Sequence, residues 1–281
     1  MKKAVIFSLM TFLLLLSLLI LSTNYISREK ELERQSLGAN TGDRLRYTED
    51  DLISGVHESL LSIAFTLTNT SSASILSFSG GKLDSALDHP ALMAAYKRFI
   101  EDNYSILTNT RITLNNFSSG FRLEPYGSSY LLNRTSATLT IPNASSLQQL
   151  RLQISVSESL SNLLSNSSPA DTGPLPIQVE FLDLQGKELL SDTSANLNPS
   201  AQNPSFQILF SGGKILQVNF GKPAGRNTTL LINATNLVAD ITLVELTLSK
   251  AQNLSLSDGS LYLSLPSAEA SKTRAIILKQ S

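Results

Sequence analysis

Few residues in this chain are of the types that carry out chemistry. It has 281 residues, with no cysteine and two histidines, His57 and His89. The absence of cysteine excludes disulfides, thiolate metal sites and thiol nucleophiles, and two histidines cannot form a three-histidine metal site. We expect His57 in a membrane-proximal helix and His89 at the surface, where another helix starts. No Gly-x-Ser-x-Gly motif offers a serine nucleophile. The sequence therefore predicts no catalytic residue, cofactor or metal.

Carboxylates are the remaining candidates, because glycoside hydrolysis needs two that face each other. Glu180 and Asp183 are three residues apart, so a regular strand would place them on opposite faces. Glu245 lies between Val244 and Leu246 and faces solvent if those two are buried. We expect structural or solvated carboxylates and a non-enzymatic protein. A membrane-tethered carbohydrate-active enzyme is the alternative from another functional class.

The most frequent motif is the Asn-x-Ser/Thr sequon, which is the acceptor for N-glycosylation in exported proteins. Composition alone would give about four such motifs, because each asparagine meets a hydroxyl residue two positions later with a chance of about 0.22. Nine occur, and none has proline in the middle position. The glycosylation candidates are Asn69, Asn103, Asn116, Asn133, Asn143, Asn166, Asn227, Asn233 and Asn253.

One segment is rich in aromatic residues and glycines. Between positions 116 and 130 the sequence places Phe117, Phe121, Tyr126 and Tyr130 around two glycines. Core packing is one interpretation of this cluster. The other is a recognition loop for a sugar or a protein partner, because β-sandwiches that bind ligands often display aromatic platforms.

The overall composition points to an exported, folded protein. Serine and threonine together make up about 22% of the chain, against 16% charged residues and a net charge of −1. The near-zero charge argues against nucleic-acid binding. A hydrophobic fraction of 42% is sufficient for a core, so the chain is not a disordered stalk. Many sequons without disulfides fit an archaeal surface better than a eukaryotic secretory protein.

The amino terminus reads as a membrane anchor. Residues 4–21 are uncharged and mostly apolar, and the first charge after them is Arg28. Residues 4–26, if helical, can cross a hydrocarbon core of roughly 30 Å. Lys2 and Lys3 precede the run, which favours a cytoplasmic amino terminus and an extracytoplasmic bulk, in a single-pass protein of the cell membrane. A cleavable signal peptide is the alternative, but this apolar run is longer than is typical.

A third interpretation of this region comes from a resemblance. The short basic leader Met1–Ala4, followed by an apolar helix and a charged stretch, resembles the first 35 or so residues of type IV pilin-like proteins, particularly archaeal ones. Leu9 stands where that family usually carries a glutamate. The resemblance implies cleavage after Ala4 and packing of the apolar helix into a surface filament.

Helical patterns flank the start of the exported part. Residues 27–62 are charged and helix-favouring and predict a helical stalk. Within it, Thr48 and Asp51 resemble a capping box, and Leu52 begins a periodic apolar face. A second helix is predicted over 88–100, with Asp88 as its N-cap and a proline in its first turn.

The remainder alternates between apolar and hydroxyl or amide residues, which is typical of β-strands. A mainly β fold is expected, with β-sandwich or jelly-roll-like domains. Residues 165–176 are a linker or a long loop, which would separate a sandwich part at 63–164 from another at 177–281. The predicted strands are 63–67, 110–114, 121–124, 137–141, 150–156, 177–184, 206–210, 215–220, 229–233, 240–248, 260–265 and 274–278.

Together these features predict a single-pass surface protein with a structural, adhesive or envelope-binding role. Its expected partners are the lipid bilayer, through residues 4–26, and an envelope glycan or surface proteins, with self-association as a further possibility. A pilin-like subunit of a surface filament is the alternative from the same compartment.

Overall fold

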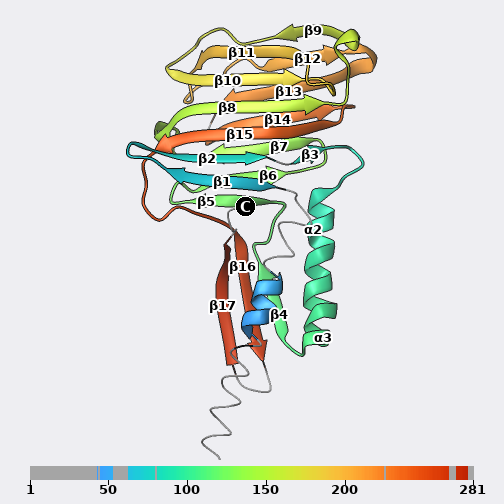
Figure 1. The fold of residues 1–281 in the computed structure, drawn as a ribbon, viewed down its shortest axis with the longest axis vertical. Coiled ribbons are helices and arrows are strands. Elements are labelled where there is room, and N and C mark those ends of the chain that lie inside the picture. Colours follow the sequence, from blue (N-terminus) through green and yellow to red (C-terminus); the bar gives the residue numbers. More distant parts are fainter. Residues whose placement is uncertain are drawn as a thin grey trace, which may run out of the picture.

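The computed structural model describes residues 43, 45–52, 63–79, 81–224, 226–265 and 270–277. The described chain is mainly β, as predicted, and forms two sheets that share one hydrophobic core (Figure 1). The strands of each sheet alternate buried apolar and outward polar residues. In Lys214–Gly221, for example, Leu216 and Val218 are fully buried, whereas Gln217 and Asn219 are half-buried.

Among the described residues, seven strands form the first sheet. Its order is β1-β2-β15-β8-β10-β11, with β3 beside β15. All neighbouring strands are antiparallel except β8 and β10, which are parallel. The bounds are Ala64–Asn69 (β1), Ala73–Ser79 (β2), Lys82–Leu83 (β3), Leu147–Val156 (β8), Leu175–Leu182 (β10), Glu188–Leu197 (β11) and Ala239–Ser249 (β15).

Ten described strands form the second sheet, in the order β17-β16-β5-β6-β7-β14-β13-β12-β9, with β4 beside β16. Every pairing is antiparallel. The bounds are Arg111–Asn115 (β4), Gly120–Glu124 (β5), Ser128–Leu132 (β6), Ser136–Ile141 (β7), Leu163–Ser167 (β9), Phe206–Phe210 (β12), Lys214–Gly221 (β13), Thr228–Thr235 (β14), Ser255–Leu265 (β16) and Ala270–Ile277 (β17).

Both sheets combine strands from the two halves of the chain. Strand β15 lies between β2 and β8, and β14 pairs with β7. The parts predicted at 63–164 and 177–281 are therefore not separate domains. Residues 165–176 run from β9 to β10 inside one sandwich, which corresponds to the long-loop interpretation of this segment.

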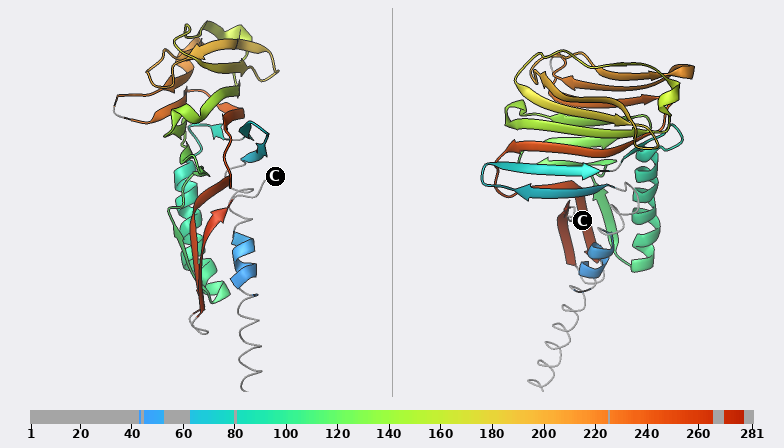
Figure 2. Two further views of the ribbon diagram at one scale, coloured as in Figure 1. Left: turned by 90° about the vertical axis from the view of Figure 1, so that its left-hand side faces the viewer. Right: turned by 45° about the horizontal axis from the view of Figure 1, so that its top comes forward.

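The second sheet continues beyond the two-sheet part of the molecule. Strands β4, β16 and β17 extend past the sandwich as a three-stranded arm, with a helical segment alongside (Figures 1 and 2). That segment consists of α2 (His89–Arg98), the π-helical turn η1 (Phe99–Tyr104) and α3 (Ser105–Thr108). A carboxylate oxygen of Glu101 accepts a hydrogen bond of 2.8 Å from the backbone N–H of Leu114, so η1 satisfies an edge group of β4.

The helix predicted over 88–100 is confirmed and continues to residue 108. Asp88 is the predicted N-cap, because its side chain accepts a hydrogen bond of 3.0 Å from the backbone N–H of Ala91. The prediction of a surface position for His89 is wrong. Its ring is buried and its Nε2 lies 3.0 Å from the carbonyl oxygen of Lys82, because the helix start packs against the end of the short strand β3.

Residues 45–52 form a helix that packs against the arm. Leu45 and Leu52 are buried in the common core. The predicted capping box is not at a helix start, because the chain is already helical three residues before Thr48. The rest of the predicted stalk, together with His57, lies outside the described residues.

Glu49 joins this helix to β17 electrostatically. Its carboxylate is buried and lies 2.5 Å from both Lys272 Nζ and Arg274 Nη1. Burial alone would raise the pKa of Glu49, but the hydrogen bonds and charges of Lys272 and Arg274 outweigh it and hold this pKa below its ordinary value. The two ion pairs of Glu49 therefore stabilise the attachment of the helix to the arm at neutral pH.

Replacement of Glu49 by Gln is expected to lower the free energy of unfolding at pH 7 by about 1–2 kcal/mol, a modest value because both cations are partly exposed. The pKa of Glu49 is depressed, so its contribution is present above the unfolded-state pKa and is lost as pH falls through the folded-state pKa. Urea unfolding of both proteins should show a difference that shrinks towards pH 3. An equal difference at both pH values would contradict the assignment.

Candidate functional site

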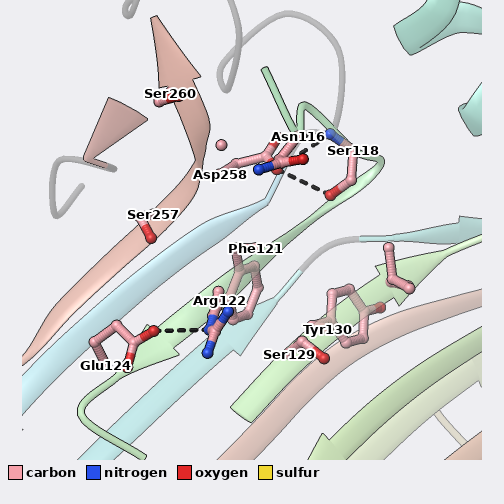
Figure 3. A pocket seen from close by; sticks show the side chains of 12 residues that line it. Asn116, Ser118, Phe121, Arg122, Glu124, Ser129, Tyr130, Ser257, Asp258 and Ser260 are labelled. Atoms are coloured by element: carbon pink, nitrogen blue, oxygen red, sulfur yellow. Dashed lines mark hydrogen bonds and ion pairs between the residues drawn. The ribbon is translucent and has the colours of Figure 1, made fainter. Parts of the chain in front are cut away.

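A cavity of about 430 Å³ opens where β5, β6 and β16 meet (Figure 3). This volume is within the range of roughly 300–1,000 Å³ that small-molecule sites occupy. Four serines and three charged residues contribute to its lining, together with apolar surface from residues that include Phe121, Tyr130 and Leu131. The lining residues are Asn116, Ser118, Phe121, Arg122, Glu124, Ser129, Tyr130, Leu131, Ser257, Asp258, Gly259 and Ser260.

A β-bulge in β16 creates this cavity. Residues 255–257 of β16 pair with β5, whereas residues 260–264 pair with β4. Between these two stretches the register of β16 against β17, on its other side, shifts. Gly259 lies in the shift with a φ of +69°. A Cβ at this position would stand 2.4 Å from the carbonyl oxygen of Asn115. Only glycine therefore fits without displacing the backbone of the neighbouring strand.

The bulge turns the carboxyl group of Asp258 towards the loop between β4 and β5. Asp258 is only 3% exposed. Its Oδ1 accepts hydrogen bonds from the backbone N–H of Ser118 at 3.1 Å and from the Ser118 hydroxyl at 2.9 Å, and Oδ2 lies 3.4 Å from the same N–H (Figure 3). Burial raises the pKa of Asp258 to about 7, although the two Ser118 donors act in the opposite direction.

The outer side of the cavity carries opposite charges and one apolar side chain. Arg122 Nε and Glu124 Oε1 form an ion pair of 2.7 Å on β5 (Figure 3). Leu131 on the neighbouring strand β6 is 42% exposed. Hydroxyl and carboxylate oxygens accept hydrogen bonds and guanidinium donates them, while Leu131 offers an apolar surface. The lining therefore suits a neutral molecule with many hydroxyl groups and an apolar face.

The structure brings part of the predicted recognition loop to this cavity. Phe121 and Tyr130 line it, yet their rings lie in the core, where they stack with centroids 5.3 Å apart and both contact Phe78. Phe117 is half-buried beside Tyr96. Tyr126 is half-buried and its hydroxyl donates a hydrogen bond to the carbonyl oxygen of Ser249. The four rings thus do not form an exposed aromatic platform.

All nine sequon asparagines lie in the described part of the chain, and none is buried. Eight are exposed and Asn233 is half-buried. Of the eight other described asparagines, four are exposed and Asn203 is buried. Asn116 is the sequon residue that lines the cavity. The Nδ2 of Asn166 donates a hydrogen bond of 2.8 Å to the carbonyl oxygen of Leu189.

The carboxylates singled out in the sequence have structural partners. Val244 and Leu246 are fully buried, so Glu245 has the opposite orientation, as predicted, and accepts a hydrogen bond of 3.0 Å from the Ser77 hydroxyl. Glu180 accepts one of 2.8 Å from Gln153. Asp183 follows the end of β10, where its Oδ1 accepts hydrogen bonds from the backbone N–H groups of Gln185 and Lys187. None of these three lines the cavity.

The sequence did not predict that Asp258, Arg122 and Glu124 lie together at one cavity. One signal was present, because Asp258-Gly259 interrupts the alternating pattern of Ser255–Leu265, and a glycine inside a strand pattern often marks a bulge. The approach of Ser118 to Asp258 spans 140 residues of sequence and depends on the sheet order.

Gly259→Ala is expected to lower the free energy of unfolding by about 3 kcal/mol, because left-handed strain adds to a backbone clash. Gly186→Ala is the matched control, since Gly186 has a φ of +75° and its Cβ would meet nothing within 4 Å. We expect about 1 kcal/mol there. Urea denaturation of both variants measures the difference. Equal losses would show that the bulge tolerates a side chain.

Asp258→Asn is expected to stabilise the protein by about 2 kcal/mol at pH 8 and to have little effect at pH 4. The pKa of Asp258 is raised in the folded state, so its contribution to stability is full below the unfolded-state pKa and is lost as pH rises to about 7. Asparagine keeps an oxygen acceptor for Ser118 without a buried charge. The change also creates an Asn-Gly-Ser sequon, so both proteins are made in a host without N-glycosylation. Unfolding midpoints at both pH values test the expectation, and a pH-independent difference would contradict it.

Within the part of the chain that the structure describes, no three or more His, Cys, Asp or Glu side chains are grouped so that they could hold a metal ion. No helix of the described ranges is both long and apolar enough to cross a membrane, and the predicted anchor at residues 4–26 lies outside them. No protein-family model, curated protein or solved structure matches this chain.

Proposed function

We propose that this chain is a non-enzymatic, single-pass surface protein that presents a glycosylated β-sandwich outside the cell, in a structural, adhesive or envelope-binding role. The observation that carries the proposal is the position of the sequons. Eight of the nine acceptor asparagines are exposed, whereas Asn203, the buried asparagine of the described residues, belongs to no sequon. Folding therefore leaves the acceptor sites accessible, as glycosylation requires.

The distribution of these sites over the sandwich supports a contact role. Asn69 stands at the end of β1, and no other sequon asparagine lies on a strand of the first sheet. Across the outer face of that sheet, Glu245 pairs in register with Ser77 on one side and with Arg151 on the other. This face would stay free of glycans, and its hydroxyl and charged side chains suit a polar partner such as an envelope glycan or another surface protein.

The hydrogen-bond and ion-pair partners of the cavity carboxylates support the non-enzymatic interpretation. Asp258 is held by Ser118, and Glu124 is held by Arg122. Glycoside hydrolysis needs one carboxyl group free to transfer a proton and a second one free to act as nucleophile or base. Both groups here have partners that stabilise the local fold.

The proposal predicts that the full-length protein from its natural host carries glycans and keeps its amino terminus. Intact-mass analysis should give a mass above 30.4 kDa, and peptide mapping should locate sugars on the exposed sequons. Protease treatment of intact cells should remove the region after Ser27, because we place it outside.

A mass equal to that of the bare chain would remove the glycosylation argument. Loss of residues 1–4 would instead favour the pilin-like alternative, because that family is processed at this position. Protection of the region after Ser27 in intact cells, but not in permeabilised cells, would show that the proposed orientation is inverted.

A further inference from the structure

One sequon is part of the cavity at the β16 bulge. Asn116 lines the cavity and is exposed, and the serine of the same sequon, Ser118, donates to the buried carboxyl of Asp258 (Figure 3). The acceptor site is thus held at its Ser118 end. Its asparagine stands at the cavity, and its hydroxyl residue is bound inside.

The backbone of this loop is held in one shape. Asn116 has a φ of +53°, in the left-handed region that asparagine tolerates better than most residues. Two residues later the backbone N–H of Ser118 is bound by Asp258. A sugar linked to Asn116 would therefore start from a defined position beside the cavity, and a fixed starting position lowers the entropic cost of seating it.

The lining matches the surface of a pyranose. A sugar ring presents hydroxyl groups at its edge and apolar C–H groups on its faces. Ser257 and Ser260 offer hydroxyls, the Arg122–Glu124 pair offers a donor and acceptors, and Leu131 offers an exposed apolar surface. The volume of about 430 Å³ also lies in the small-molecule range.

We propose that this cavity binds a saccharide, and that the bound saccharide is the first part of the glycan attached to Asn116. The proposal rests on the glycosylation of the surface protein proposed above. It assigns the cavity to the chain's own glycan, which packs over Leu131 and the polar rim and stabilises the junction between sandwich and arm.

Asn253 is a matched control for Asn116. It is also an exposed sequon asparagine, with a φ of +56°, and it lies in the turn between β15 and β16 without lining the cavity. Replacing either residue by glutamine removes one glycan and places glutamine in the same backbone region. The glycan that is removed stands beside the cavity in one variant and away from it in the other.

The test compares thermal unfolding midpoints of full-length wild type, Asn116→Gln and Asn253→Gln, each made in the natural host and in a host without N-glycosylation. In the glycosylating host Asn116→Gln should lower the midpoint by about 3 °C more than Asn253→Gln. Without glycosylation the midpoint shifts of Asn116→Gln and Asn253→Gln should agree, because no glycan then fills the cavity in any variant.

A second pair of variants tests binding of the glycan in the cavity without removing the acceptor asparagine, Asn116. Leu131→Ser should lower the midpoint more in the glycosylated protein than in the bare chain, since it removes the apolar surface under the sugar. Leu160→Ser, at a leucine outside the cavity that is also 42% exposed and where serine creates no sequon, should give the same shift in both forms.

Sugars on other sequons but not on Asn116 would contradict the proposal that the cavity binds the Asn116 glycan, and would leave the proposed surface-protein function intact. Equal host dependence of Asn116→Gln and Asn253→Gln, or of Leu131→Ser and Leu160→Ser, would also contradict it. Absence of sugar from all nine sequons would overturn both this inference and the glycosylation on which it rests.

Discussion

The shape of the molecule depends on one irregularity, the bulge in β16. A single regular strand continues in one register, but β16 pairs with β5 in its first part and with β4 in its second. One extra residue of β16 relative to β17, in the stretch that holds Asp258 and Gly259, lies where the partner changes. The same strand can therefore close the sandwich and also build the arm, against which helix 45–52 and the η1 segment pack.

The carboxyl group of Asp258 secures this junction at an electrostatic cost. Its Oδ1 accepts hydrogen bonds from both the backbone N–H and the hydroxyl of Ser118. The buried position disfavours the charged form, so the group is held near its titration point at neutral pH. Glu49 shows the opposite balance, because Lys272 and Arg274 compensate for its burial. The molecule thus has one buried acid that is held by the amide and hydroxyl of Ser118 inside the bulge, and one acid that is paired with two cations at the arm.

The sequence predicted local features well and long-range ones poorly. The helix from Asp88 follows from its N-cap and the proline in its first turn, which are local signals in the sequence. Strands such as Ser128–Leu132 were missed, because their alternation is short and rich in serine. The cavity was not predicted, since it joins Ser118 to Asp258 through sheet order. His89 was misplaced because its burial comes from Lys82, on a strand of two residues.

If the chain is exported as proposed, the position of β15 has a consequence for the order of folding and glycosylation. This strand begins at residue 239, yet it lies between β2 and β8 and bridges the earliest and middle parts of the first sheet. A chain that emerges amino terminus first cannot complete this sheet until residue 249 has left the translocation channel. Eight of the nine sequons precede that point. They would meet the glycosylation machinery on an open chain, and Asn116 would receive its sugar before β16 arrives to close the cavity beside it.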